Sequence, residues 1–282
     1  MNDMAHPIID DAWRAWIRHN VERGCSRDEL FKILLDEGFE YGSIQRELGH
    51  TPAVDPSLIR NPLKPQAVPD RSQHPQRPDA AMMPGLRRTA SPHLEIYTVE
   101  AFLGVRECAE IIALTRGRLR QSEISAPDER DASFRISRTC DLDDVDHPAV
   151  AALNRRIYRA MQTTAACAEP MQAQYYDVGG EFKAHTDYFE SYELGKYSTS
   201  TLGQRTWTFM IYLNEPESGG ETAFTAAGLV LSPKTGCAVI WNNLLPDGSP
   251  NPGTIHHGMP VRRGYKAIIT KWLRAPRSGG TR

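Results

Sequence analysis

Short apolar runs separated by clusters of turn residues fill the second half of the chain. The clusters after Met171 are 178–180, 216–220, 233–236, 246–253 and 262–264. Many short strands at such spacing are typical of a β-sandwich or jelly roll. Residues 105–119 and 148–161 instead carry apolar residues at helical spacing. We therefore predict a mainly β fold with flanking helices that brace one of its faces.

A proline-rich stretch separates this part of the chain from its N-terminal end. Nine of the 20 prolines lie within residues 50–92, where they remove backbone donors and oppose regular structure. We interpret the stretch as a linker, with a proline-rich ligand for another protein as the alternative. The predicted organisation is a small helical segment (1–49), the Pro-rich linker (50–92), a main domain (93–276) and a flexible tail (277–282).

The N-terminal segment has the apolar spacing and the capping residues of short helices. Trp13, Trp16 and Ile17 recur at helical spacing, and Ser26 with Glu29 forms a capping-box pattern. A third helix is predicted to end before Gly49. So few apolar residues cannot make a very stable domain, so this segment is expected to dock on the main domain or on a partner.

Charge and cysteine content exclude several classes of function. The 33 basic and 35 acidic residues give a net charge of −2, so no broad basic field predicts nucleic-acid binding. No stretch approaches the roughly 18 uncharged apolar residues of a membrane span. The five cysteines are scattered without a Cys-x-x-Cys pair, which indicates reduced thiols. We expect a cytoplasmic protein with neither nucleic-acid nor membrane partners.

Two separated stretches contain residues suited to bind a metal. In Phe182-Lys183-Ala184-His185-Thr186-Asp187, strand alternation would place His185 and Asp187 on the same face. About 70 residues later, 254–261 contains the adjacent pair His256 and His257. Two histidines and one carboxylate on one side of iron(II) leave three adjacent positions open. These positions suit a bidentate 2-oxo acid together with oxygen.

A lysine on a later apolar strand supplies a third signal. Period-2 alternation puts Lys266 on the same face as Ile268, Thr270 and Trp272. An unpaired buried ammonium is unfavourable, so Lys266 calls for a carboxylate partner. The distal carboxylate of a dicarboxylic co-substrate would fit. The alternative is a surface lysine that extends its ammonium into water.

These residues, in this order, resemble the iron(II)/2-oxoglutarate dioxygenases, specifically the prolyl 4-hydroxylase branch. The resemblance covers residues 93–275. The matching motifs are Tyr176 to Phe182, Gln204 to Asn214, Gly219-Gly220-Glu221-Thr222, Trp241 to Gly248, His256 to Val261, and Gly264 to Arg274. The departures are modest: Phe182 stands where tyrosine is frequent, and Thr270 where asparagine is common.

The resemblance implies a double-stranded β-helix, or jelly roll, as the catalytic domain. It assigns His185, Asp187 and His256 as iron ligands, and leaves His257 facing away from the metal. Lys266 would pair with the far carboxylate of 2-oxoglutarate. The co-substrate pocket would also contain three further side chains: Tyr176, Thr208 and Trp272.

The implied activity is hydroxylation of an unactivated C–H bond, with oxidative decarboxylation of 2-oxoglutarate to succinate and CO2. Iron(II), 2-oxoglutarate and O2 are the implied cofactor and co-substrates, and ascorbate is a candidate addition. Asp187 favours hydroxylation, because halogenating relatives lack that carboxylate. The leading substrate is a prolyl residue in a protein or peptide. The alternatives are a free amino acid or small metabolite, a catalytically silent binding module, and a cupin-type isomerase or hydrolase.

The segment after Asp187 is the candidate substrate region. Residues 188–203 are rich in Tyr, Ser and Thr with glycines at 195 and 203, which predicts a lid beside the metal. An ordinary solvated loop is the alternative. The candidate substrate residues are Tyr188, Tyr192, Tyr197, Arg138 and Trp241. The sequence does not indicate an oligomeric state.

Overall fold

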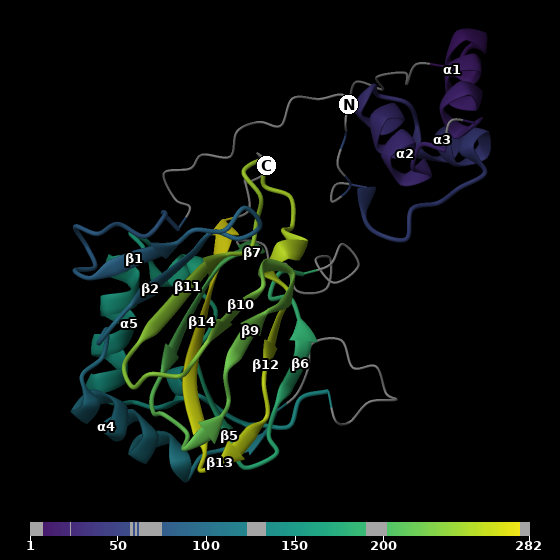
Figure 1. The fold of residues 1–282 in the computed structure, drawn as a ribbon. Coiled ribbons are helices and arrows are strands. Elements are labelled where there is room, and N and C mark those ends of the chain that lie inside the picture. The colour runs from purple at the N-terminus through teal and green to yellow at the C-terminus, as the bar shows by residue number, and fades with distance from the viewer. Residues whose placement is uncertain are drawn as a thin grey trace. The chain divides into compact units, whose positions relative to one another are not determined.

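The computed structural model describes residues 8–22, 24–56, 59, 61, 75–122, 134–189 and 202–276 of the 282-residue chain. The chain divides into two compact units, Met1–Pro69 and Asp70–Arg282 (Figure 1). Each unit has its own hydrophobic core.

The first unit contains three helices: α1 (Asp11–Glu22), α2 (Arg27–Asp36) and α3 (Tyr41–Leu48). The Ser26 side chain accepts a hydrogen bond from the Glu29 backbone and so caps α2. Gly49 ends α3 in the left-handed conformation, with φ of 55°. The apolar faces of the helices meet around the fully buried Phe31. The predicted N-terminal helical segment is thereby confirmed.

The second unit is built on an eight-stranded sheet with strand order β1-β2-β11-β7-β14-β5-β4-β3, antiparallel throughout. Its strands are β1 (Leu86–Thr89), β2 (Ile96–Val99), β3 (Arg120–Gln121), β4 (Arg138–Asp141), β5 (Gln172–Tyr176), β7 (Leu202–Tyr212), β11 (Ala238–Asn242) and β14 (Lys266–Pro276).

A smaller sheet lies on one side of the large one, and helices lie on the other (Figure 1). The small sheet has the order β10-β9-β12-β6, and β8 pairs separately with β13. These strands are β6 (Phe182–His185), β8 (Ser218–Gly219), β9 (Thr222–Phe224), β10 (Leu229–Leu231), β12 (His256–Gly258) and β13 (Val261–Arg263). The covering helices are α4 (Val105–Arg116) and α5 (Pro148–Ala160).

Alternation along the two longest strands separates two apolar layers. On β7, Phe209 and Ile211 pack in the core shared with α4 and α5. Met210 and Tyr212 point the other way, into the space between the sheets. On β14, Ile269 and Ile268 divide in the same manner. The predicted mainly β fold with flanking helices is confirmed, and the inter-sheet face is the one available for chemistry.

The proline-rich stretch does not behave as a linker along its whole predicted length. β1 pairs with β2 from Leu86 to Thr89, and Met83 is buried in the main core. The backbone N–H of Gln76 donates to Met161. Residues 76–89 therefore belong to the second unit, a correction to the predicted 50–92 boundary. The remainder of that stretch is described only in part, and the predicted tail, 277–282, lies outside the described residues.

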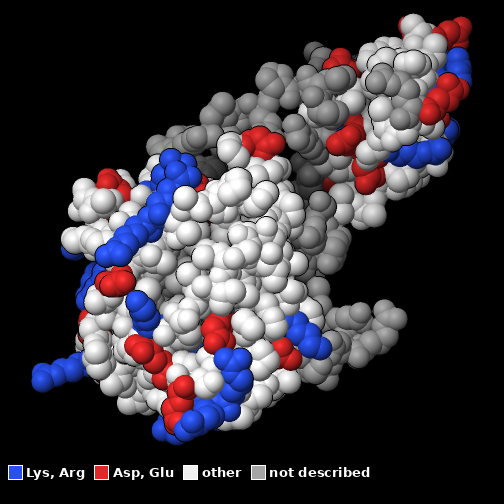
Figure 2. Space-filling model, viewed as in Figure 1, with Lys and Arg blue, Asp and Glu red and all other residues white. Residues whose placement is uncertain are grey.

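The visible charged side chains of the second unit are concentrated toward its margins (Figure 2). Over β9 and β10 the surface is largely uncharged, because residues 222–233 contain no Asp, Glu, Lys or Arg. Among the described residues, no helix is long and apolar enough to cross a membrane.

A tight approach between two loops depends on Gly236. Its φ is +78°, and a Cβ there would lie 2.0 Å from the Leu103 carbonyl oxygen. We expect Gly236→Ala to lower the free energy of unfolding by more than about 2 kcal/mol, because the clash adds to the backbone strain. Gly228→Ala is the matched control, since Gly228 has φ of +62° and nothing within 4 Å of its Cβ position. The control should lose only about 1 kcal/mol in urea unfolding, and equal losses would contradict the predicted clash.

Candidate functional site

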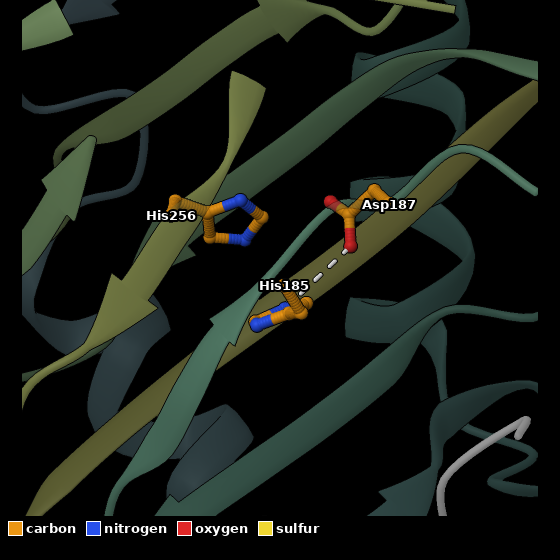
Figure 3. A group of neighbouring side chains, drawn as sticks. All are labelled: His185, Asp187 and His256. Atoms are coloured by element: carbon orange, nitrogen blue, oxygen red, sulfur yellow. Dashed lines mark ion pairs between the residues drawn. The ribbon is translucent and has the colours of Figure 1, made fainter. Parts of the chain in front are cut away.

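Strand pairing in the small sheet brings three potential metal ligands together. His185 is the last residue of β6 and lies directly opposite His256, the first residue of β12. Asp187 follows two residues after His185. One ligand atom from each residue lies within 4.8 Å of the other two, and the three side chains point toward one another (Figure 3). This spacing is short enough for a single ion to contact all three.

The backbone fixes both imidazole rings in the tautomer that a metal requires. His185 Nδ1 lies 2.7 Å from the Lys183 carbonyl oxygen, and His256 Nδ1 lies 2.9 Å from that of Thr254. A carbonyl oxygen can only accept, so each Nδ1 carries its proton. The Nε2 lone pairs remain available as metal ligands. Each carbonyl belongs to the residue two positions earlier, so local backbone geometry orients both rings.

The charge state of the cluster also suits a cation. Burial, reinforced by the His256 ring, lowers the pKa of His185 to about 3. Burial alone would raise the pKa of Asp187, but the two neighbouring histidines and Arg205 outweigh it and hold that pKa below its usual value. The site therefore presents a carboxylate and a neutral imidazole at physiological pH. Two nitrogens and one oxygen form the donor set that divalent iron accepts.

A cavity whose wall includes all three of these residues is also lined by Lys266. Lys266 is 2% exposed, and the described residues offer its ammonium no salt bridge or hydrogen bond. Its Nζ lies 5.4 Å from the ring centre of Tyr176 and 5.6 Å from that of Tyr212. Burial lowers the pKa of Lys266 to about 7, although the charge of Glu221 partly opposes the shift. The cavity thus has a cation that an anionic ligand would stabilise.

Hydroxyl groups surround the lysine end of the cavity. Tyr176 lines it, and its hydroxyl donates to Gln174 at 2.8 Å. Thr222 also lines it and accepts from the Tyr212 hydroxyl at 2.7 Å. Thr222 was missed as a site residue, although it belongs to the Gly219-Gly220-Glu221-Thr222 motif. Its place as the last residue of that motif was a signal for it.

Two tryptophans on the cavity wall have buried donors without acceptors. Trp241 Nε1 and Trp272 Nε1 are inaccessible to solvent and find no hydrogen-bond partner among the described residues. The Trp241 ring meets the His256 ring edge-on at 5.0 Å. Leaving a buried donor unpaired costs about 1–3 kcal/mol. Together with Lys266, these donors fit a ligand rich in acceptor oxygens, such as a dicarboxylate.

The other predicted site residues do not all lie at the cavity. Thr208 is not among the residues that line the cavity, and its hydroxyl donates to Asp187 Oδ2 at 2.7 Å; its role in the co-substrate pocket stays a prediction. Tyr188 is buried next to Asp187. Arg138 is half-exposed, pairs with Asp177 at 2.7 Å and does not line the cavity. Tyr192 and Tyr197, with most of the predicted lid, lie outside the described residues.

The ring of Phe182 packs against His185, one of the three clustered residues. It stacks on the His185 imidazole with ring centres 3.5 Å apart and an interplanar angle of 18°. The Arg135 guanidinium also lies over the Phe182 ring, 4.8 Å from its centre. The neighbouring His257 turns away from the cluster and lies 3.0 Å from Glu181. Only one of the two adjacent histidines therefore faces Asp187.

Comparison with known proteins finds a family whose model matches part of the chain. Residues 171–274, which include the three clustered residues and Lys266, match the 2OG-Fe(II) oxygenase superfamily. This part of the chain is similar to the oxygenase domains of that superfamily. Iron(II) and 2-oxoglutarate, the two groups in the family's description, are the cofactor and co-substrate for which the His-Asp-His cluster and the cationic cavity provide a site.

Several prolyl 4-hydroxylase subunits are similar to this chain. The chain is 33% identical to human prolyl 4-hydroxylase subunit alpha-1 over 163 residues, which cover 57% of this chain and 30% of the relative. It is 32% identical to the alpha-2 subunit from Caenorhabditis elegans over 142 residues, covering 50% and 26%. The chain thus spans about a third or less of these relatives' length.

A solved structure shares the fold. The viral collagen prolyl hydroxylase from Paramecium Bursaria Chlorella virus-1 superposes with a TM-score of 0.51 at 24% identity, covering 64% of this chain and 96% of that one. The predicted jelly roll is thereby confirmed for the oxygenase domain.

Proposed function

We propose that this protein is an iron(II)/2-oxoglutarate-dependent dioxygenase that hydroxylates prolyl residues in a protein or peptide. The observation that carries the proposal is the joint presence, in one cavity, of the His185–Asp187–His256 cluster and an unpaired buried Lys266. A metal-binding module alone would not need the lysine, and an anion site alone would not need the cluster. The prolyl substrate rests on the resemblance to prolyl 4-hydroxylases.

The proposed roles of the residues follow from their chemistry. His185 and His256 through Nε2, with Asp187 through its carboxylate, would hold the iron, and one carboxylate leaves the dication with net charge +1. Lys266 would pair with the far carboxylate of 2-oxoglutarate and fix one orientation of the dianion. With O2, bound iron and 2-oxoglutarate would supply oxidative decarboxylation to succinate and CO2, in which one oxygen atom of O2 enters succinate and the other enters the substrate.

The remaining cavity residues would orient the co-substrate and exclude water. The Tyr176 and Thr222 hydroxyls lie on the wall that contains Lys266 and can contact the same carboxylate. The indole N–H groups of Trp241 and Trp272 would satisfy further oxygens. We retain Tyr188, Trp241 and Arg138 as proposed substrate contacts, of which Tyr188 adjoins Asp187 directly. The protein itself would contribute by orienting the co-substrate and the substrate and by excluding water.

Three further features belong to the proposal. The unit Met1–Pro69 has its own core and would serve as a docking element for a protein substrate. A cytoplasmic location is compatible with the five free cysteines. Ascorbate is proposed as an additional cofactor only through the family resemblance.

An assay that couples succinate to hydroxyproline tests this function. The iron-loaded protein should release succinate from 2-oxoglutarate and add one oxygen atom to proline residues of a peptide library, as measured by mass spectrometry. Free proline, offered at the same concentration, should remain unmodified. Hydroxylation of free proline alone would refute the protein-substrate proposal while keeping the enzyme class. No succinate under any condition, from protein shown to bind metal, would refute the dioxygenase itself.

A further inference from the structure

A buried hydrogen-bond relay stands behind the Asp187 carboxylate. Thr208, on β7, is fully buried and its Oγ1 lies 2.7 Å from Asp187 Oδ2. Asn243, one residue beyond β11, places its Nδ2 2.9 Å from the same Oγ1. A carboxylate cannot donate, so the single hydroxyl proton of Thr208 must point at Asp187. The hydroxyl oxygen can then only accept, which requires the NH2 group of Asn243 on that side.

Asn243 keeps this orientation although it leaves the side-chain oxygen Oδ1 without a hydrogen bond among the described residues. Its side chain is completely buried, and its Oδ1 has no hydrogen-bond partner among the described residues. A buried unpaired acceptor costs about 1–3 kcal/mol. The backbone of Asn243 is fixed at both ends, because its N–H donates to Thr206 and its carbonyl accepts from Asn251. The contact that this orientation provides is the hydrogen bond from the Asn243 NH2 group to Thr208 Oγ1.

The relay acts on a ligand that lies beyond the paired part of its strand. β6 ends at His185, so strand pairing does not extend to Asp187. Thr208 engages Oδ2, whereas Oδ1 lies 3.9 Å from His185 Nε2. One carboxylate oxygen is thus held by Thr208 and the other faces the His185 ring.

We propose that Thr208 and Asn243 are positioning residues that direct Asp187 Oδ1, and not Oδ2, toward the metal. The inference rests on the proposed iron site and deepens it, because it assigns a role to two residues that touch neither metal nor substrate. Removing such an outer partner of a metal ligand typically weakens metal affinity about 10- to 100-fold. The effect belongs to the hydroxyl proton, so a residue that keeps the hydroxyl should keep the affinity.

Manganese(II) binding to the full-length, metal-free protein, measured by titration calorimetry without 2-oxoglutarate, tests the relay. Thr208→Val should weaken binding about 10- to 100-fold, whereas Thr208→Ser should restore it to near the wild-type value. Thr206→Val is the matched control: Thr206 is buried on the same strand but donates to the Leu273 carbonyl. It should bind manganese like the wild type. Thermal unfolding of each metal-free variant establishes that folded protein is being compared.

Substitution of Asn243 tests the direction of the relay. Asn243→Asp would offer Thr208 an acceptor, draw its proton away from Asp187 and weaken manganese binding. Asn243→Leu would remove the amide without competing for that proton, so its loss of affinity should be smaller. Wild-type affinity in Thr208→Val would overturn the inference. Failure of the wild type itself to bind manganese would instead overturn the proposed function.

Discussion

Replacing Asp187 by alanine should reduce succinate formation by more than about 100-fold, a loss greater than that expected for an outer partner of the ligand. The variant removes the only carboxylate of the His185–Asp187–His256 cluster. It also leaves the Thr208 hydroxyl, which donates to that carboxylate, without its acceptor. Two neutral imidazoles would then face the dication alone, so manganese affinity should fall together with turnover.

Asp177→Asn is the matched control for this prediction. Asp177 is an exposed carboxylate before the same metal-binding strand and pairs with Arg138, outside the cavity wall. The control should bind manganese and form succinate as the wild type does. The pKa of His185, about 3, adds a second check: near neutral pH, manganese binding should release no proton from this ring. Equal turnover in wild type and Asp187→Ala would contradict the role of Asp187.

Period-2 alternation predicted the faces of the fold well because it is a local property of the strand. It placed His185 and Asp187 on one face and separated Met210 and Tyr212 from Phe209 and Ile211, as the structure does. The helices followed from apolar spacing and capping residues. Cross-strand pairing of His185 with His256 could not be predicted this way, because register between strands 70 residues apart is a tertiary property.

Two differences show what a single sequence cannot supply. Alternation put Thr208 on the inner face but could not say which side chain it would contact; in the structure its hydroxyl donates to Asp187. The sequence did not predict β1, because this strand is short and carries two exposed arginines, Arg87 and Arg88. An edge strand needs little apolar surface, so neither its pattern nor the surrounding prolines distinguished it from a linker.

The affinity for 2-oxoglutarate should fall as the pH rises above about 7, because burial lowers the pKa of Lys266 to about 7. Below that pH the ammonium already carries its proton and the affinity should be constant. Above it, every bound dianion must bring a proton to Lys266, so the affinity should fall up to about tenfold per pH unit. Calorimetry on the manganese-loaded protein between about pH 6 and 9 measures both the affinity and this proton uptake.

Substitution of the lysine separates this charge effect from packing. Lys266→Met keeps the apolar stem but removes the ammonium, and should weaken 2-oxoglutarate binding by about 2–5 kcal/mol, or roughly 30- to 4,000-fold, with no remaining pH dependence above 7. Lys271→Met is the control, since Lys271 is equally buried on the opposite face of β14 and lies 3.7 Å from Asp143. It should leave the affinity unchanged.

The same ammonium should make the ligand-free protein less stable near neutral pH. The pKa of Lys266 is about 7 when folded, against 10.5 as the ordinary value, so the unfolded chain binds more protons between these two values. The free energy of unfolding should therefore rise with pH across that window, and the penalty is fully present below it. Lys266→Met removes the penalty and should unfold at higher urea concentration at pH 7 while binding the dianion less well. A variant that lost both stability and affinity would show that Lys266 supports the fold and does not serve as the anion site.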